Sequence, residues 1–185
     1  MSSGQISQLL GKHAKSFLFD IGASLYYSGA GGASQSWFVE EYRNVGIIFD
    51  QIYSWELTVH HPQKIFEDLP FEVLVAMHYY NIGVNADHNS KYNPWRFIRK
   101  LSRRSDFVVV KLDIDNVAME ERLVHDLLND SIALGLIDEF YWEHHTGGNP
   151  MQYRGWGRQS SNNIVQSYEL FGRLRGHGIR AHSWV

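Results

Sequence analysis

The sequence predicts an α/β fold: a doubly wound, mostly parallel, Rossmann-like sheet with helices on both faces. Apolar runs of strand length alternate along the chain with segments of helical periodicity, an order that produces parallel strands joined by crossover helices. The run FVVVKL, from Phe107 to Leu112, is typical of a strand buried on both faces of such a sheet. The 185 residues contain no internal repeat and no linker, so one domain is expected over residues 1–185.

The elements of the first half follow from hydrophobic spacing and from breaker residues. Apolar residues at helical spacing indicate the helices, and β-branched or aromatic runs indicate the strands. Pro70 is typical of a helix start. The expected elements are a helix at Ile6 to Ala14, a strand at Phe17 to Ile21, a Ser-capped helix at Ser34 to Asn44, a strand at Ile47 to Glu56, a turn and a helix within Pro62 to Met77, and a strand at His78 to Val84.

The second half repeats the same alternation. A polar loop, Asn85 to Asn93, precedes a proline that opens the next helix. A glycine-rich loop is expected to run to Ser160. The remaining predicted elements are a helix at Pro94 to Arg104, the strand that starts at Phe107, a helix at Val117 to Leu128, a strand at Ile137 to Trp142, a helix at Asn163 to Arg175, and a strand at Ile179 to Trp184.

Composition excludes several functional classes. The formal charge of −3 and the pI of about 6.3 provide no basic field, so neither a nucleic acid nor a membrane is an expected partner. Without cysteine there is no disulfide, thiolate metal site or cysteine nucleophile. No apolar stretch approaches the roughly 20 residues that span a bilayer, and the first 14 residues are too polar for a signal peptide. The chain is expected to be soluble, in an unassigned compartment and oligomeric state.

The segment from Ser16 to Phe38 reads as a strand, a glycine-containing loop and a helix start. At the carboxyl end of a first parallel strand, glycine backbone and helix N–H groups approach a nucleotide-like ligand without side-chain clashes. Asp20 and Gly22 therefore mark a candidate cofactor loop. Its glycines match neither G-x-G-x-x-G nor a P-loop, and an ordinary surface loop is the alternative.

Glu56 ends the second predicted strand. A carboxylate at this place accepts two hydrogen bonds from a ribose diol in nucleotide-binding sheets. The alternative is a solvated carboxylate at a strand end, which is a common position for Glu.

The order of motifs resembles the FkbM-like family of S-adenosylmethionine-dependent methyltransferases. The motifs are FLFDIGAS before a helix, a strand ending in WE, YYNIGV, VVVKLDIDN before a helix, and a strand ending in EFYWEHH. The resemblance covers Phe17 to Val185. It implies S-adenosylmethionine as cofactor and methylation of a hydroxyl on a small molecule or a glycan. It also implies that Asp20, Gly22 and Ala23 lie in the cofactor loop, that Glu56 holds the ribose, and that Lys111 to Asn116, with Asp113, border the methionine end and the acceptor.

The sequence departs from the family in three places. The loop from Leu25 to Gly32 is longer than usual, and Asn116 stands where a glycine is usual. Only one strand is expected after the last long helix, where a methyltransferase sheet normally ends in an antiparallel pair.

Further polar residues follow the fourth and fifth strands. His144 and His145 are candidates for the base that deprotonates an acceptor hydroxyl, because histidine titrates near neutral pH, although packing roles are equally compatible. Asp113 and Asp115 form a DxD pattern of the kind that holds Mg²⁺ or Mn²⁺ in many glycosyltransferases. Strand alternation argues against both carboxylates pointing the same way, so no metal is assigned. The alternative functions are a non-catalytic Rossmann-like binding module and a metal-dependent glycosyltransferase.

Overall fold

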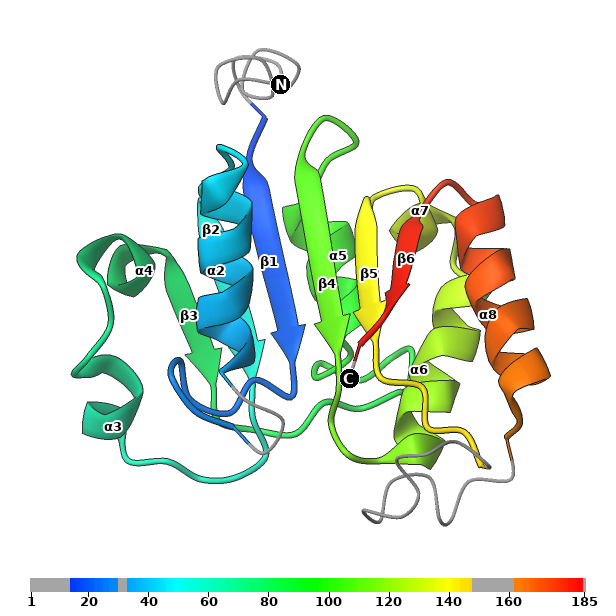
Figure 1. The fold of residues 1–185 in the computed structure, drawn as a ribbon, viewed down its shortest axis with the longest axis horizontal. Helices are drawn as coiled ribbons and strands as arrows, with labels where there is room; N and C mark the ends of the chain where they lie inside the picture. Colours follow the sequence, from blue (N-terminus) through cyan, green and yellow to red (C-terminus); the bar gives the residue numbers. More distant parts are fainter. Residues whose placement is uncertain (1–13, 30–32, 148–161, 185) are drawn as a thin grey trace.

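A computed structural model describes residues 14–29, 33–147 and 162–184. At its centre lies a six-stranded sheet with strand order β3-β2-β1-β4-β5-β6 (Figure 1). Every pair of neighbouring strands is parallel. The strands are β1 (Ser16–Ile21), β2 (Gln51–Trp55), β3 (Met77–Tyr80), β4 (Phe107–Leu112), β5 (Glu139–Trp142) and β6 (Arg180–Ser183).

The chain builds this sheet outwards from the centre in two directions. It runs from β1 to β2 and β3, then returns to the middle and runs from β4 to β5 and β6. The prediction of a doubly wound, Rossmann-like α/β fold is thereby confirmed. Because β1 and β4 are neighbours that lead in opposite directions, their carboxyl ends form the switch point where ligands bind in open parallel sheets.

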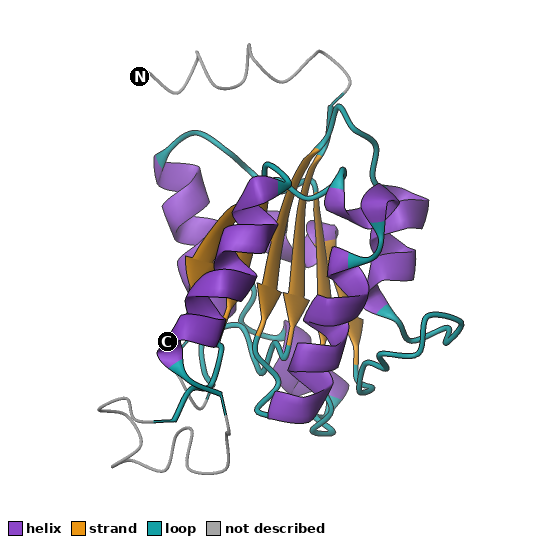
Figure 2. Ribbon diagram, turned by 90° about the vertical axis from the view of Figure 1, so that its right-hand side faces the viewer, coloured by secondary structure: helices purple, strands orange, loops and turns teal. Residues whose placement is uncertain are grey.

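Helices cover both faces of the sheet, which Figure 2 shows nearly edge-on. Apolar side chains from alternate strand positions separate into two cores, because successive residues of a strand point to opposite faces. Helices α2 (Ser34–Asn44) and α4 (Phe71–Ala76) contribute to one core. The other core takes side chains from α5 (Pro94–Leu101), α6 (Val117–Leu128), α7 (Ser131–Leu134) and α8 (Ile164–Gly176). None of the helices in the described ranges is long and apolar enough to cross a membrane.

Several element boundaries differ from the sequence-based expectation. Helix α4 begins directly after Pro70, as expected, but the segment before it, where only a turn was expected, also contains a short helix, α3 (Pro62–Phe66). Strand β2 begins only at Gln51. Ile47 and Phe49 are buried in the core, but the pairing of β2 with β1 begins only after them, at Gln51.

The other boundary changes are smaller. Strand β3 ends at Tyr80, α5 ends at Leu101 and β5 begins at Glu139. Helix α2 begins after Ala33 without a side-chain cap, so the expected serine cap is wrong. The short helix α7 was not expected; it begins because the Asp130 side chain accepts a hydrogen bond from the N–H of Ala133. The helix expected at Ile6 to Ala14, apart from its last residue, and most of the loop expected up to Ser160 lie outside the described residues.

Candidate functional site

A cavity of about 660 Å³ opens at the carboxyl edge of the sheet. It lies where the loops that follow β1, β2, β3, β4 and β5 come together, at the edge toward which all arrowheads point in Figure 1. The cavity therefore occupies the place that the fold favours for a ligand. The described residues that line it are Gly22, Ser24, Ser34, Trp55, Glu56, Leu57, Thr58, Ile82, Gly83, Val84, Lys111, Asp113, Ile114, Asp115, Asn116, Met119, Glu143 and Trp184.

Gly22 brings the loop after β1 against the loop after β4. Its φ is +88°, and a Cβ at this position would lie 1.6 Å from the carbonyl oxygen of Asp113. The N–H groups of Gly22 and Ala23 both donate to the carbonyl oxygen of Trp55, at 2.9 Å each. Only glycine fits this conformation and this approach. The side chain of Ala23 is fully buried, so Ala23 contributes to the loop through its backbone.

The continuation of this loop is held by three side chains. The buried Gln35 donates from Nε2 to the carbonyl oxygen of Ala23 at 3.1 Å. The Tyr79 hydroxyl donates to the carbonyl oxygen of Ser24 at 2.7 Å. Ser24 itself has a φ of 52°, and its N–H donates to the Glu56 carboxylate. These contacts give the cavity a preorganised wall.

Glu56 both lines the cavity and organises its rim. One carboxylate oxygen, Oε2, accepts the N–H of Ser24 at 2.9 Å, and Oε1 accepts the N–H of Thr58 at 2.6 Å. Each carboxylate oxygen has a further lone pair, so Glu56 retains the capacity to accept hydrogen bonds from a ligand. The structure thus gives Glu56 a loop-positioning role that its sequence position alone did not reveal.

Asp20 does not line the cavity. It is fully buried, with Oδ1 3.4 Å from the Nζ of Lys111, which does line the cavity. That ammonium donates to the carbonyl oxygen of Gly22 at 2.6 Å and lies 3.3 Å from Oδ2 of Asp113. Burial raises the pKa of Asp20 to about 6, although Lys111 opposes the shift. Burial alone would lower the pKa of Lys111, but Asp20 and Asp113 outweigh it and the net shift is upward.

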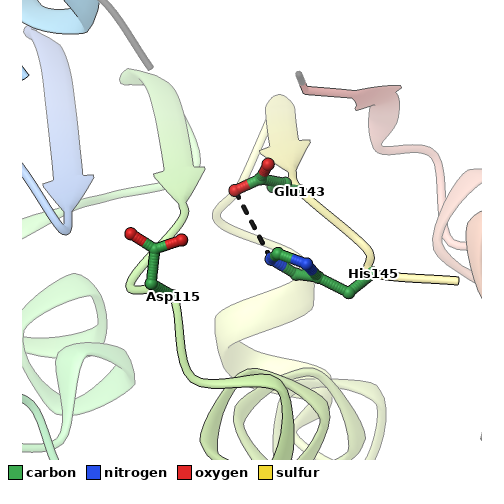
Figure 3. Close-up of side chains that lie close together, drawn as sticks. All are labelled: Asp115, Glu143 and His145. Carbon is green, nitrogen blue, oxygen red and sulfur yellow. Dashed lines mark ion pairs between the residues drawn. The ribbon is translucent and has the colours of Figure 1, made fainter. Parts of the chain in front are cut away.

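Asp115, Glu143 and His145 form a cluster beside the cavity. Each offers a ligand atom within 4.8 Å of the other two. Figure 3 shows Glu143 and His145 on the segment that follows β5, opposite Asp115 on the loop that follows β4. Oε2 of Glu143 lies 3.5 Å from Nε2 of His145.

Burial and neighbouring groups shift the pKa values of Glu143 and His145 in this cluster. Burial raises the pKa of Glu143 to about 7, His145 opposes the shift, and the nearby Asp113 adds to it. The hydrogen bond with Glu143 raises the pKa of His145. Among the predicted bases, His145 is the one that the structure brings to the acidic edge of the cavity.

His144 packs against the last residue of β5 instead. Its ring stacks on Trp142 with centroids 4.2 Å apart, and Nε2 lies 3.3 Å from Nδ2 of Asn162. Burial lowers the pKa of His144 to about 4. Neither histidine is among the described lining residues, but His145 contacts Glu143, which is, whereas His144 packs on Trp142. The packing alternative therefore describes His144 better.

Two supporting residues gave no clear signal in the sequence. Glu120, on α6, is buried and accepts the N–H of Ile114 at 2.9 Å and the indole N–H of Trp142 at 3.2 Å. It thereby ties the loop after β4 to β5. Tyr79 holds the opposite wall, as described above, through an equally non-local contact.

The predicted site residues thus separate into those that line the cavity and those that do not. Gly22, Glu56 and Asp113 meet in the lining of one cavity, and Asp115 and Glu143 join them there. Asp20 and Ala23 are fully buried next to the residues of the lining, and His144 packs on Trp142 at the end of β5. Lys111 is the residue that sequence reasoning undervalued, although a charged residue inside an apolar strand signals a buried partner.

The cavity is predominantly acidic. Glu56, Asp113, Asp115 and Glu143 contribute carboxyl groups to its described lining, and Lys111 is the one basic residue in it. The Lys111 ammonium is already engaged with Asp20 and Asp113. A field of this sign favours cationic ligands and opposes anionic ones.

Comparisons of the chain with protein-family models, with curated proteins and with solved structures gave no significant match.

Proposed function

We propose that the chain is an S-adenosylmethionine-dependent methyltransferase that methylates a hydroxyl group of a small molecule or a glycan. The observation that supports this most is the cavity at the carboxyl ends of β1 and β4, with Glu56 at the end of β2. This arrangement meets the general requirement for an adenosine ligand in an open parallel sheet, in which the acidic residue after the second strand accepts the ribose hydroxyls.

The lining next to Glu56 suits the base of adenosine. Leu57 and Ile82 lie on this side and present exposed apolar surface, 76% and 37% of their respective accessible areas. A flat aromatic base covers such surface favourably. In this proposal the adenine lies against Leu57 and Ile82, and the ribose lies against Glu56.

The charge of the cavity distinguishes this cofactor from other adenosine ligands. S-adenosylmethionine carries a sulfonium and an ammonium group against one carboxylate, so its net charge is positive. Dinucleotides and nucleotide sugars carry a pyrophosphate, which the acidic lining would repel even though Glu143, with a pKa of about 7, is only partly charged at neutral pH. The acidic lining therefore favours S-adenosylmethionine over a nicotinamide dinucleotide.

Methyl transfer places few chemical demands on the protein. The acceptor oxygen forms a bond to the methyl carbon, the sulfur–carbon bond breaks, and its electron pair remains on sulfur as S-adenosylhomocysteine. The hydroxyl proton passes to a base, for which Asp113 and Glu143, both in the described lining, are the candidates. Orientation of the two reactants supplies most of the remaining rate enhancement.

Calorimetric titration with S-adenosylmethionine and with NAD⁺ tests this proposal. We expect saturable binding of the first and none of the second. Binding of NAD⁺ alone, or of neither ligand, would overturn it. Saturable binding of S-adenosylmethionine without methyl transfer to any of a panel of hydroxyl acceptors would favour a non-catalytic module. Binding of a nucleotide sugar only with Mn²⁺ would favour a glycosyltransferase.

A further inference from the structure

We propose that Asp115, Glu143 and His145 bind a divalent cation at the edge of the cavity. No metal was predicted from the sequence, and no single motif contains these three residues. They meet because β4 and β5 are neighbours whose following segments turn toward each other (Figure 3). Two carboxylates and an imidazole whose ligand atoms lie within 4.8 Å of one another form a mixed oxygen and nitrogen donor set.

A buried atom of Glu143 points independently to a ligand. Glu143 is 4% exposed and lines the cavity, yet its Oε1 has no hydrogen-bond partner among the described residues. A buried carboxylate oxygen without a partner is costly, because it has lost its hydration without replacement. The other oxygen of this carboxylate, Oε2, lies 3.5 Å from Nε2 of His145, so a cation bound by both oxygens of Glu143 would satisfy Oε1 as well.

The spacing of the three groups suits a small divalent ion. Around an octahedral cation with bonds of about 2.1 Å, neighbouring ligand atoms lie about 3 Å apart and opposite ones about 4.2 Å apart. The 3.5 Å between Glu143 Oε2 and His145 Nε2 and the 4.8 Å limit for the whole cluster are slightly wider. Rotation of the exposed Asp115 side chain toward the other two closes this difference without movement of the sheet.

The backbone holds two of the ligands in place. The N–H of Glu143 donates to the carbonyl oxygen of Leu112 at 3.2 Å, which fixes the start of the segment after β5. Asp115 has a φ of 54°, a left-handed conformation that turns the chain just before α6. Asp and Asn adopt this conformation more readily than most residues, so Asp115 can be replaced by Asn without added strain.

The two aspartates of the DxD pattern have different partners. β4 ends at Leu112, so strand alternation no longer governs Asp113 and Asp115. The Asp113 carboxylate faces Lys111, at 3.3 Å from Nζ, whereas Asp115 belongs to the cluster with Glu143 and His145. The proposed ligand set therefore differs from one in which both aspartates hold the metal.

The donor set indicates the kind of cation. Carboxylates suit Mg²⁺ and Mn²⁺, whereas imidazole suits the transition metals, so Mn²⁺ accepts all three groups. Three protein ligands leave coordination positions open on the side of the cavity. There the cation would hold the oxygen of the acceptor hydroxyl, with Asp113 left to take its proton. This role rests on the proposed methyl transfer, but cation binding itself does not.

Electron paramagnetic resonance of Mn²⁺ titrated into the full chain tests the site, because bound Mn²⁺ loses the sharp signal of the free ion. We expect one saturable site in the parent protein. Asp115→Asn, and separately His145→Phe, should weaken it by about tenfold or more, since each removes a ligand. Asp68→Asn removes an exposed carboxylate outside the cavity lining and should leave the affinity unchanged.

The possible results separate clearly. No saturable Mn²⁺ binding in the parent would overturn the site, and so would equal affinity in the parent and in Asp115→Asn. Circular dichroism shows whether each variant is folded, and the exposed Asp115 keeps the test decisive if His145→Phe does not fold. Mn²⁺ binding that is lost in these variants, in a chain that binds no S-adenosylmethionine, would support the cation site and contradict the methyltransferase.

Discussion

Lys111 and Asp20 face each other from the neighbouring strands β4 and β1, with Nζ 3.4 Å from Oδ1 and both side chains closed off from solvent. Neither carboxylate oxygen of Asp20 accepts a hydrogen bond from a described residue. The pair therefore depends on charge attraction in a dry environment, which makes it sensitive to loss of either partner. The Lys111 ammonium also donates a hydrogen bond to the Gly22 carbonyl oxygen, so the pair links the core of the sheet to the cavity wall.

Lys111→Met should destabilise the protein in a pH-dependent way. Burial raises the pKa of Asp20 to about 6 from an ordinary 3.8, so protonation of Asp20 favours the folded state. This contribution is complete below pH 3.8 and is lost as the pH rises through about 6. Without Lys111 the pKa rises further. We expect a loss of about 3–5 kcal/mol at pH 8 and a clearly smaller loss at pH 5, measured by urea unfolding.

The double variant Lys111→Met with Asp20→Asn should recover much of the loss at pH 8, because no fully buried charge is left without its partner; Asp113 also loses Lys111 but is partly exposed. Lys64→Met, at an exposed position on α3, is the control and should change little at either pH. The same loss at both pH values, or no recovery in the double variant, would contradict this account of the pair.

Gly22→Ala should be far more destabilising than Gly178→Ala. Both glycines have a φ close to +89°. A Cβ on Gly178 meets nothing within 4 Å, whereas one on Gly22 would lie 1.6 Å from the Asp113 carbonyl oxygen. We expect a cost of about 1 kcal/mol at Gly178 and about 3 kcal/mol or more at Gly22. Thermal unfolding of the two variants measures the difference, and similar costs would show that the two loops do not touch in this way.

Tyr79→Phe should loosen the wall of the cavity. It removes the hydroxyl that donates to the Ser24 carbonyl oxygen, at a cost of about 0.5–1.5 kcal/mol in unfolding free energy. If this wall holds the cofactor, affinity for S-adenosylhomocysteine should fall several-fold as well. Tyr80→Phe is the matched control on the next residue and should have little effect on either quantity. An unchanged affinity in Tyr79→Phe would mean that the wall does not contact the ligand.

Local patterns in the sequence predict most of the fold. The helix at Val117 to Leu128 has the expected bounds because its apolar periodicity and the Asn116 cap coincide. The segment from Ile47 to Asp50 shows the limit of such reasoning. Two of its apolar side chains are buried like those of a strand. The Asp50 carboxylate, however, accepts hydrogen bonds from the N–H and the hydroxyl of Ser16, and the pairing of β2 with β1 begins only at the next residue, Gln51.

The sequence predicted those site residues that follow directly after a strand. It did not predict those that reach the site through contacts between distant parts of the chain. Glu56 and Asp113 follow strands whose order places them at one edge, so they could be expected to meet. Side-chain direction was not predictable: His144 turns to Trp142 and His145 to Glu143, although the two are sequence neighbours.

Titration calorimetry of S-adenosylhomocysteine with the parent and with Glu56→Gln tests the central claim, that Glu56 holds the ribose of a bound cofactor. Gln keeps the shape but loses the charge and one acceptor. The account predicts measurable affinity in the parent and a loss of about 1.5–3 kcal/mol in Glu56→Gln, or roughly 10- to 150-fold. Glu169→Gln, on the exposed face of α8, should bind like the parent. Equal affinity in the parent and Glu56→Gln would contradict the ribose assignment, and no binding by the parent would contradict the cofactor itself.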